Sequence, residues 1–219
     1  MKPGLGDVEL ALAAGWGNGR NNDAPGSSDL FSVPNLVMQP KAILLDFNGV
    51  IINDEPLHAK LIQDVLLSEN LRPKDGDYWS TCLGRSDRDR LRELFEVRGR
   101  LLDEAALDRL IAAKSAAYQQ TLSSLKKLPL YPELRDFLFQ VRGRQIPLAI
   151  VSEAMPADIE AVLTRAELFD VFAVIISAVD TASSKPAPAP YELAIQRLNE
   201  QYPTLNIQPE DCLAVEDTY

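Results

Sequence analysis

Polar side chains that could do chemistry follow the four short apolar runs of this sequence. They offer carboxylates, an amide, a hydroxyl and an ammonium group, and they belong to Asp46, Asn48, Ser152, Lys185, Glu216 and Asp217. Phosphoryl transfer needs such a set: a carboxylate that attacks phosphorus, a cation and hydroxyl that bind the phosphoryl oxygens, and carboxylates that hold a metal. Mg²⁺ prefers hard oxygen ligands and typically takes one or two carboxylates. The set therefore predicts phosphoryl transfer, with Asp46 and Asp217 suited to Mg²⁺.

The elements that must position these groups follow from the spacing of apolar residues. The four apolar runs are predicted strands, at residues 42–46, 147–151, 173–176 and 212–215. Segments with helical spacing alternate with the last three strands, at residues 132–142, 156–166 and 190–199. This alternation indicates a parallel sheet with crossover helices. In such sheets ligands bind at the carboxyl ends of the strands, which is where the polar groups lie.

The segment between the first strand and the others has helical spacing throughout. Apolar residues recur at helical intervals over residues 56–70, 91–95 and 101–122. Ser86, with an aspartate three residues later, and Asp103, before a run rich in Ala and Leu, are predicted helix N-termini. We therefore expect an all-helical block inserted after the first strand.

The composition indicates a globular protein that acts on small molecules. The chain has 219 residues, of which 46% are hydrophobic and 25% charged, as in ordinary soluble domains. Its net charge of −10 argues against nucleic-acid and membrane partners, because both attract basic surfaces. No apolar run reaches the roughly 20 residues that cross a bilayer, and the N-terminus lacks the features of a secretory signal. The two cysteines, Cys82 and Cys212, disfavour a disulfide scaffold or zinc site, so a cytoplasmic location is expected.

Four segments resemble the motifs of the haloacid dehalogenase superfamily. DFNGVIINDEPLH (residues 46–58) is similar to the first motif, IVS (150–152) to the second, SKPAP (184–188) to the third and VEDT (215–218) to the fourth. Their order and spacing agree, and the match covers roughly residues 41–219. It most resembles the β-phosphoglucomutase-like branch, whose helical cap is inserted after the first motif.

The resemblance implies an α/β fold: a Rossmann-like, three-layer parallel-sheet core with an inserted α-helical cap. The core would comprise residues 41–54 and 128–219, and the cap residues 55–127. Residues 1–40, rich in Gly, Asn, Ser and Pro, would form a disordered N-terminal extension. The chain ends at Tyr219, directly after the fourth motif, where relatives continue, so we expect the C-terminal part of the core to be missing. Such a fragment would be marginally stable or prone to aggregation.

Carried over onto this sequence, the resemblance also implies roles for single residues. Asp46 would form an aspartyl-phosphate, and Ser152 and Lys185 would hold the phosphoryl group. Asp46, Asp217 and the backbone carbonyl of Asn48 would coordinate Mg²⁺.

Further roles fall to one more acidic residue and to the cap. Glu216 would be an indirect or alternate metal ligand. Residues 83–89 are similar to the substrate-facing cap loop of the family, so Gly84 and especially Arg85 are predicted to bind substrate. His58, the single histidine, would lie near the hinge of the cap, as a packing or substrate-contacting residue rather than an acid or base. The other arginines of residues 88–100 alternate with acidic residues, which favours a solvated helix with ion pairs.

Two residues depart from the family pattern. Asn48 stands where the family has a second aspartate that protonates the leaving alkoxide and later activates water, a contribution of roughly 10²–10⁴-fold. An amide can do neither, which leaves three outcomes: a slow phosphatase, an enzyme whose leaving group needs no proton, or a protein that binds a phosphorylated ligand without turnover. Glu153 puts a negative charge beside the phosphate site, so we expect it to face the cap or solvent.

The sequence thus predicts a Mg²⁺-dependent haloacid dehalogenase-like hydrolase, a phosphatase for a small phosphorylated metabolite. A phosphosugar mutase is the second hypothesis, and a catalytically silent phospholigand-binding protein is the third. Substrate identity and oligomeric state stay open.

Overall fold

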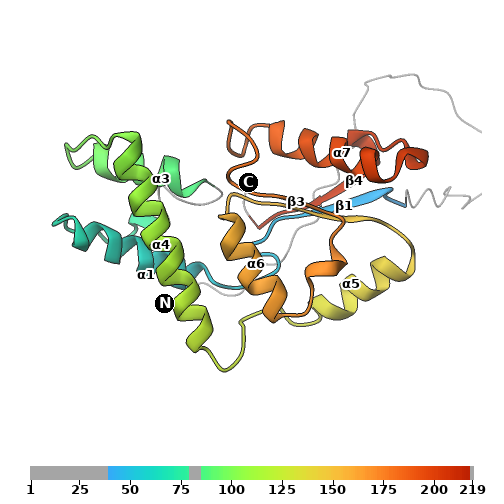
Figure 1. Cartoon of the computed structure of the whole chain (residues 1–219), viewed down its shortest axis with the longest axis horizontal. Coiled ribbons are helices and arrows are strands. Elements are labelled where there is room, and N and C mark those ends of the chain that lie inside the picture. The colour runs from blue at the N-terminus through green and yellow to red at the C-terminus, as the bar shows by residue number, and fades with distance from the viewer. Residues whose placement is uncertain (1–38, 79–84, 218–219) are drawn as a thin grey trace, which may run out of the picture. The chain divides into compact units, whose positions relative to one another are not determined.

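Four parallel strands in the order β3-β2-β1-β4 form the sheet of this protein (Figure 1). The structure, a computed structural model, describes residues 39–78 and 85–217. The strands are β1 (Ala42–Leu45), β2 (Leu148–Val151), β3 (Val174–Ile176) and β4 (Cys212–Val215). Leu45 of β1 is in register with Ile150 of β2 and with Val215 of β4. The predicted parallel sheet is confirmed, and three strands end side by side. The extension predicted for residues 1–40 lies almost wholly outside the described residues.

The helices also match the predicted pattern. Those inserted directly after β1 are α1 (Glu55–Ser68), α3 (Asp87–Glu96) and α4 (Glu104–Ser124). The later ones are α5 (Leu134–Gly143), α6 (Pro156–Arg165) and α7 (Ala189–Gln201), with short 3₁₀ turns at Phe169–Val171, Pro203–Leu205 and Pro209–Asp211. Ser86 and Asp103 are the N-caps of α3 and α4, as predicted, because each side chain accepts a backbone N–H of the first turn. Among the described helices, none combines the length and apolarity that a bilayer crossing needs.

Side chains alternate between the two faces of the sheet, and each face is covered by helices. Figure 1 shows α7 on one side of the sheet and α5 and α6 on the other. Ile43, Leu45, Leu148 and Ile150 pack with apolar residues of α5 and α6. Ala42, Leu44, Ala149 and Val151 pack with Ala194 and Leu198 of α7. The sheet is therefore the middle of three layers, which explains why its strands are apolar on both faces.

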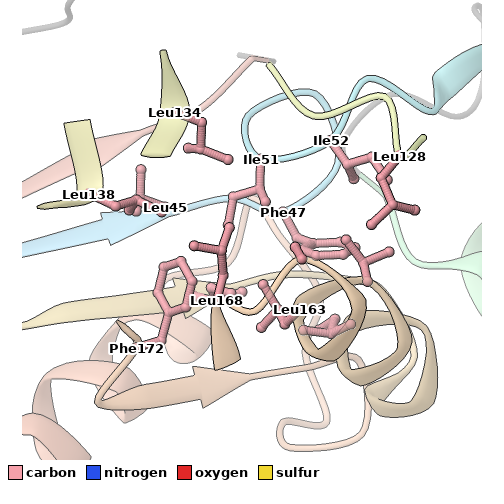
Figure 2. Close-up of a cluster of buried hydrophobic side chains, with 14 of the residues drawn as sticks. Leu45, Phe47, Ile51, Ile52, Leu128, Leu134, Leu138, Leu163, Leu168 and Phe172 are labelled. Atoms are coloured by element: carbon pink, nitrogen blue, oxygen red, sulfur yellow. The ribbon is translucent and has the colours of Figure 1, made fainter. Parts of the chain in front are cut away.

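The turn that follows β1 is anchored in the hydrophobic core. Phe47, Ile51 and Ile52 are fully buried, and Figure 2 shows them among side chains of the surrounding helices. The backbone carbonyl of Phe47 accepts hydrogen bonds from the N–H groups of Ile51 and Ile52. Asn48 and Gly49 lie between these anchored positions, so burial of their neighbours fixes the turn that carries them.

The helices inserted after β1 have a hydrophobic cluster of their own. Helix α4 packs against both α1 and α3. The cluster contains Ile62, Leu66, Leu91, Leu94, Phe95, Leu107 and Leu110. A separately packed cluster is what a cap domain needs, and the cap borders at residues 55 and 127 stay a prediction.

Candidate active site

Asp46 lies directly after β1, and the ends of the neighbouring strands carry Ser152 and Glu216. Oδ1 of Asp46 accepts a hydrogen bond from the backbone N–H of Phe47 at 2.7 Å and lies 3.1 Å from Nζ of Lys185. The structure shows no donor to Oδ2 of Asp46 among the residues it describes. One carboxylate oxygen is thus held in place, and the other is available for attack on phosphorus or for a metal ion.

Lys185 reaches Asp46 from the loop between β3 and α7. Its Nζ also lies 2.9 Å from Oε1 of Glu216 and 5.6 Å from the centre of the Tyr191 ring. Burial opposes the charge of this ammonium group, but the carboxylates of Asp46 and Glu216 outweigh that effect and raise the pKa of Lys185. The side chain is therefore a fixed cation beside Asp46, where it can neutralise the oxygens of a phosphoryl group.

Three carboxylates gather at the same edge of the sheet. Asp46, Glu216 and Asp217 each offer one oxygen, and these oxygens lie within 4.8 Å of one another. Gly49 makes room for this group: its φ is +77°, and a Cβ built there would stand 1.9 Å from Oδ2 of Asp217. Hard oxygen donors at this spacing fit Mg²⁺. The backbone carbonyl of Asn48 belongs to the same turn.

The electrostatics of this edge also favour a divalent cation. Burial and the negative charge of Asp46 raise the pKa of Glu216 to about 7, although Lys185 and a hydrogen bond from the Tyr191 hydroxyl act in the opposite direction. Burial and the charge of Asp217 likewise raise the pKa of a nearby carboxyl, that of Glu55. Asp46 and Glu216 share the ammonium group of Lys185, so a divalent ion would relieve the repulsion between the carboxylates.

Ser152 supplies a buried hydroxyl after β2. Its backbone N–H donates to the carbonyl of Ile176 at 3.0 Å, which fixes the residue to the neighbouring strand. Its Oγ accepts a hydrogen bond from the backbone N–H of Ala154 at 3.1 Å. The hydroxyl hydrogen is not donated to any group in the described part of the chain, so it can serve a phosphoryl oxygen.

An open cleft lies between these residues and the inserted helices, with a volume of about 560 Å³ that includes solvent space at its mouth. Of the residues predicted from the sequence, its walls include Asp46, Asn48, His58, Arg85, Ser152 and Asp217. Lys185 and Glu216 do not line the cleft. They form an ion pair with each other, and Lys185 also pairs with Asp46. Gly84 lies outside the described residues.

Asn48 belongs to a buried polar network rather than to the carboxylate group. Its Nδ2 lies 3.1 and 3.0 Å from the two carboxylate oxygens of Asp54 and 3.1 Å from Nε2 of His58. Asp54 also accepts a hydrogen bond from the hydroxyl of Tyr118, whose ring stacks on His58. His58 is buried in this network, and its Nδ1 lies 2.9 Å from Nζ of Lys114.

Sequence reasoning missed part of the cleft wall. Lys114, Asp87, Tyr78 and Asp158 line the cleft and are buried or partly buried, and none of them was predicted. The burial of Lys114 could have been predicted from the sequence. On α4 it follows Leu110 and Ile111 at helical spacing, on the face that the helix buries. A lysine on a buried stripe indicates a specific partner.

One expectation from the sequence is corrected. The arginines of α3 were expected on a solvated surface, but Arg90 is 6% exposed, lines the cleft and lies 4.7 Å from the centre of the Tyr78 ring. Arg88 and Arg92 do form the expected exposed ion pairs, both with Glu104.

Glu153, which was expected to face the cap or solvent, lines the cleft together with residues of the inserted helices. Its Oε1 accepts the backbone N–H of Lys185 at 2.8 Å. Burial raises the pKa of this carboxyl, although Lys185 opposes the shift. The hydrogen bond explains the inward position, because it ties the loop of Lys185 to the end of β2.

The sequence and the structure both have known counterparts. The profile of a hydrolase family described as haloacid dehalogenase-like matches residues 40–219. The chain is 25% identical over 187 residues to protein CbbY of Rhodobacter capsulatus, covering 83% of this chain and 78% of CbbY. It is 27% identical over 175 residues to fructose-1-phosphate phosphatase YqaB of Escherichia coli, covering 80% and 85%. A crystal structure of β-phosphoglucomutase from Clostridium difficile shares the fold, with a TM-score of 0.69 at 19% identity over 80% of this chain and 75% of that one.

Proposed function

Because this chain belongs to the haloacid dehalogenase-like hydrolase family, we propose that it is a Mg²⁺-dependent phosphatase for a small phosphorylated metabolite. The observation that carries the proposal is the position of Asp46, buried at a strand end beside Lys185 and two further carboxylates. A relative that hydrolyses fructose 1-phosphate supports a phosphorylated sugar or a similarly small phosphomonoester as substrate.

In the proposed reaction, a carboxylate oxygen of Asp46 attacks the phosphorus atom, and the bond from phosphorus to the leaving oxygen breaks. Lys185 neutralises charge on the phosphoryl oxygens, and the hydroxyl of Ser152 donates to one of them. The leaving oxygen takes up a proton from water, because the amide of Asn48 cannot supply one, and a water molecule then hydrolyses the aspartyl-phosphate. Asp46 is regenerated in that second step.

The residues of this edge would hold Mg²⁺ through Asp46, Asp217 and the backbone carbonyl of Asn48, with Glu216 as an indirect or alternate ligand. The spacing of the three carboxylates and the room left by Gly49 support this assignment. When bound, the ion supplies positive charge that stabilises the phosphoryl group during transfer.

The position of Asn48 favours a second candidate function, a protein that binds a phosphorylated ligand without turnover. The amide cannot give a proton to the leaving oxygen, and its nitrogen is engaged by the carboxylate of Asp54. The phosphate-binding groups Ser152 and Lys185 do not depend on that proton, so binding would survive where turnover fails.

A phosphate-release assay separates the two functions. The full chain is incubated with Mg²⁺ and a panel of phosphate esters that includes fructose 1-phosphate, beside Asp46→Ala and the control Asp136→Ala, an exposed aspartate on α5. A phosphatase releases phosphate in the wild type and the control, not in Asp46→Ala, and stops when the metal is chelated. Equal rates in all three proteins contradict the phosphatase, and calorimetry then shows whether the ligand binds. Interconversion of sugar phosphates with little free phosphate would indicate a mutase instead.

A further inference from the structure

The walls of the cleft carry more negative than positive charge. Counted over the described residues, the carboxylates of Asp46, Glu55, Asp87, Glu153, Asp158 and Asp217 line it, against the cations of Arg85, Arg90 and Lys114. Residues 79–84, between the lining residues Tyr78 and Arg85, contain no charged side chain. Two charges from Mg²⁺ at the carboxylate edge would still leave the cleft net negative, and the phosphate group of a substrate adds to the excess.

Four of the six carboxylates have charged or hydrogen-bonding partners among the groups already described. Asp46 pairs with Lys185, Asp87 pairs with Lys114 and Arg90, and Glu55 forms a hydrogen bond with Asp217. The other two, Glu153 and Asp158, form no ion pair with any residue that the structure describes. Buried carboxylates are normally paired with a cation, so these two call for an explanation.

Asp158 presents one carboxylate oxygen to the cleft. The residue lies in the first turn of α6 and is 2% exposed. Its Oδ1 accepts hydrogen bonds from Oγ of Ser115 at 2.5 Å and from Nε2 of Gln119 at 3.0 Å, both on α4. Its Oδ2 accepts no hydrogen bond from the described residues and is not sealed off by the atoms around it. Two neutral donors thus fix the carboxylate, and its second oxygen is left for a group in the cleft.

The ammonium group of Lys114 does not take this place. Its Nζ lies 2.8 Å from Oδ2 of Asp87 and 2.9 Å from Nδ1 of His58, and within the described residues it forms no ion pair with Asp158. His58 adds no charge of its own, because an ammonium group can only donate and Nδ1 must therefore accept. The cations of the inserted helices are thus committed to Asp87 and leave Asp158 unbalanced.

The electrostatics of the two carboxylates agree with their lack of ionic partners. Burial raises the pKa of Asp158, and hydrogen bonds from Ser115 and Gln119 and the charge of Lys114 do not reverse the shift. Burial likewise raises the pKa of Glu153, whose Oε1 accepts the backbone N–H of Lys185 at 2.8 Å. Neither carboxylate recovers from the protein what it loses in hydration, so a further cation in the cleft would be stabilised.

We propose that Asp158 selects phosphomonoesters whose alcohol portion carries a primary ammonium group, as in an amino alcohol or an amino sugar. The inference rests on the proposed function for the position of the phosphate, at Asp46 and Ser152. The ammonium group donates a hydrogen bond to Oδ2 of Asp158, and Glu153 adds to the negative potential without leaving the backbone N–H of Lys185. Esters with a neutral alcohol portion would bind more weakly, because they leave the charge of Asp158 unbalanced.

Calorimetry with matched ligands tests the proposal without relying on turnover. All measurements use the full chain with Mg²⁺ in an Asp46→Asn background, which removes the nucleophile and keeps a side-chain oxygen. The members of each pair differ by an ammonium group in place of a hydroxyl: 2-aminoethyl phosphate against 2-hydroxyethyl phosphate, and glucosamine 6-phosphate against glucose 6-phosphate. At least one ammonium member is expected to bind about tenfold or more tightly than its neutral partner, as hydrogen bonds to charged groups allow.

Variants of Asp158 show whether this residue causes the preference. Asp158→Asn removes the charge and keeps an oxygen for Ser115 and Gln119. It is expected to abolish the preference and to leave the affinity for the neutral partner within about threefold. Asp136→Asn, which changes an exposed aspartate of α5, is the matched control and should keep the preference. Asp158→Ser takes the place of the asparagine variant if thermal melting shows that Asp158→Asn is unfolded.

The outcomes separate the inference from the function on which it rests. No preference in either pair, or a preference that survives loss of the charge at position 158, overturns the proposal. Failure of the phosphatase function appears separately, as absent phosphate release by the wild type from all four esters while the Asp158-dependent preference is intact.

Discussion

The side-chain nitrogen of Asn48 lies 3.1 Å from Oδ1 and 3.0 Å from Oδ2 of Asp54. Asp54 is 2% exposed and also accepts the hydroxyl of Tyr118, so its carboxylate is held in place on the cap side of the turn. A carboxylate at position 48 would stand directly against it. The amide at position 48 and the acid at position 54 therefore belong together, because an amide donor satisfies a buried carboxylate and a second carboxylate repels it.

This pair predicts that Asn48→Asp alone will not give a good phosphatase. It should lower the free energy of unfolding by about 1–3 kcal/mol, because it replaces a donor to a buried carboxylate by a like charge. The double variant Asn48→Asp/Asp54→Asn restores an amide-carboxylate pair in reversed order. With an acid at position 48, it should release phosphate from alkyl phosphates about 10²-fold faster than the wild type. Equal rates and equal stability for the single and double variants would contradict the coupling.

Gly49→Ala is predicted to destroy the carboxylate group. The new Cβ would stand 1.9 Å from Oδ2 of Asp217, and the residue would hold a φ of +77°. We expect Mg²⁺ affinity, measured by calorimetry, to fall at least tenfold, because Asp217 must move away. Gly99→Ala is the control: its φ is +74° but nothing lies within 4 Å of the new Cβ, so it should cost only the backbone strain of about 1 kcal/mol and leave Mg²⁺ binding intact.

Ser184 is predicted to couple the loop of Lys185 to the inserted helices. Its Oγ donates to Oδ2 of Asp89 at 2.7 Å, at the N-terminus of α3. Loss of this contact in Ser184→Ala should raise KM several-fold, with a smaller change in kcat, because it weakens closure over the ligand by about 1 kcal/mol. Ser183→Ala changes the exposed neighbour and should leave KM as it is. An unchanged KM in Ser184→Ala would show that the contact does not serve binding.

Asp87 is predicted to stabilise the fold in a pH-dependent way. Its pKa is about 2 in the folded protein against an ordinary value of 3.8, so its contribution is complete above pH 3.8 and is lost as the pH falls toward 2. The shift corresponds to about 2 kcal/mol. Urea unfolding should show Asp87→Asn less stable than the wild type near neutral pH, with the difference shrinking as the pH falls below about 4. The same comparison for Asp64→Asn, an exposed aspartate, should show little difference at any pH.

The sequence alone was sufficient to predict the parallel sheet and to predict that the polar residues following its strands lie close together. Apolar runs and helical spacing are local properties, and parallel strands necessarily end at the same edge. The sequence therefore predicts that Asp46, Ser152 and Glu216 lie close together, and these residues do follow neighbouring strands. The N-caps Ser86 and Asp103 were equally predictable, because a cap depends on the next three residues only.

The partners of the remaining cleft residues were decided by tertiary structure. The contact between Lys114 and His58 joins residues 56 positions apart, and the one between Tyr118 and Asp54 joins residues 64 positions apart. Spacing along a helix says which face a side chain occupies but not which element packs there. The sequence could therefore not tell that Arg90 is buried while Arg88 and Arg92 form ion pairs at the surface. The sequence thus determined which groups meet at the strand ends of this protein. Only packing of the inserted helices decided which charges face them, because that packing selects partners from distant parts of the chain.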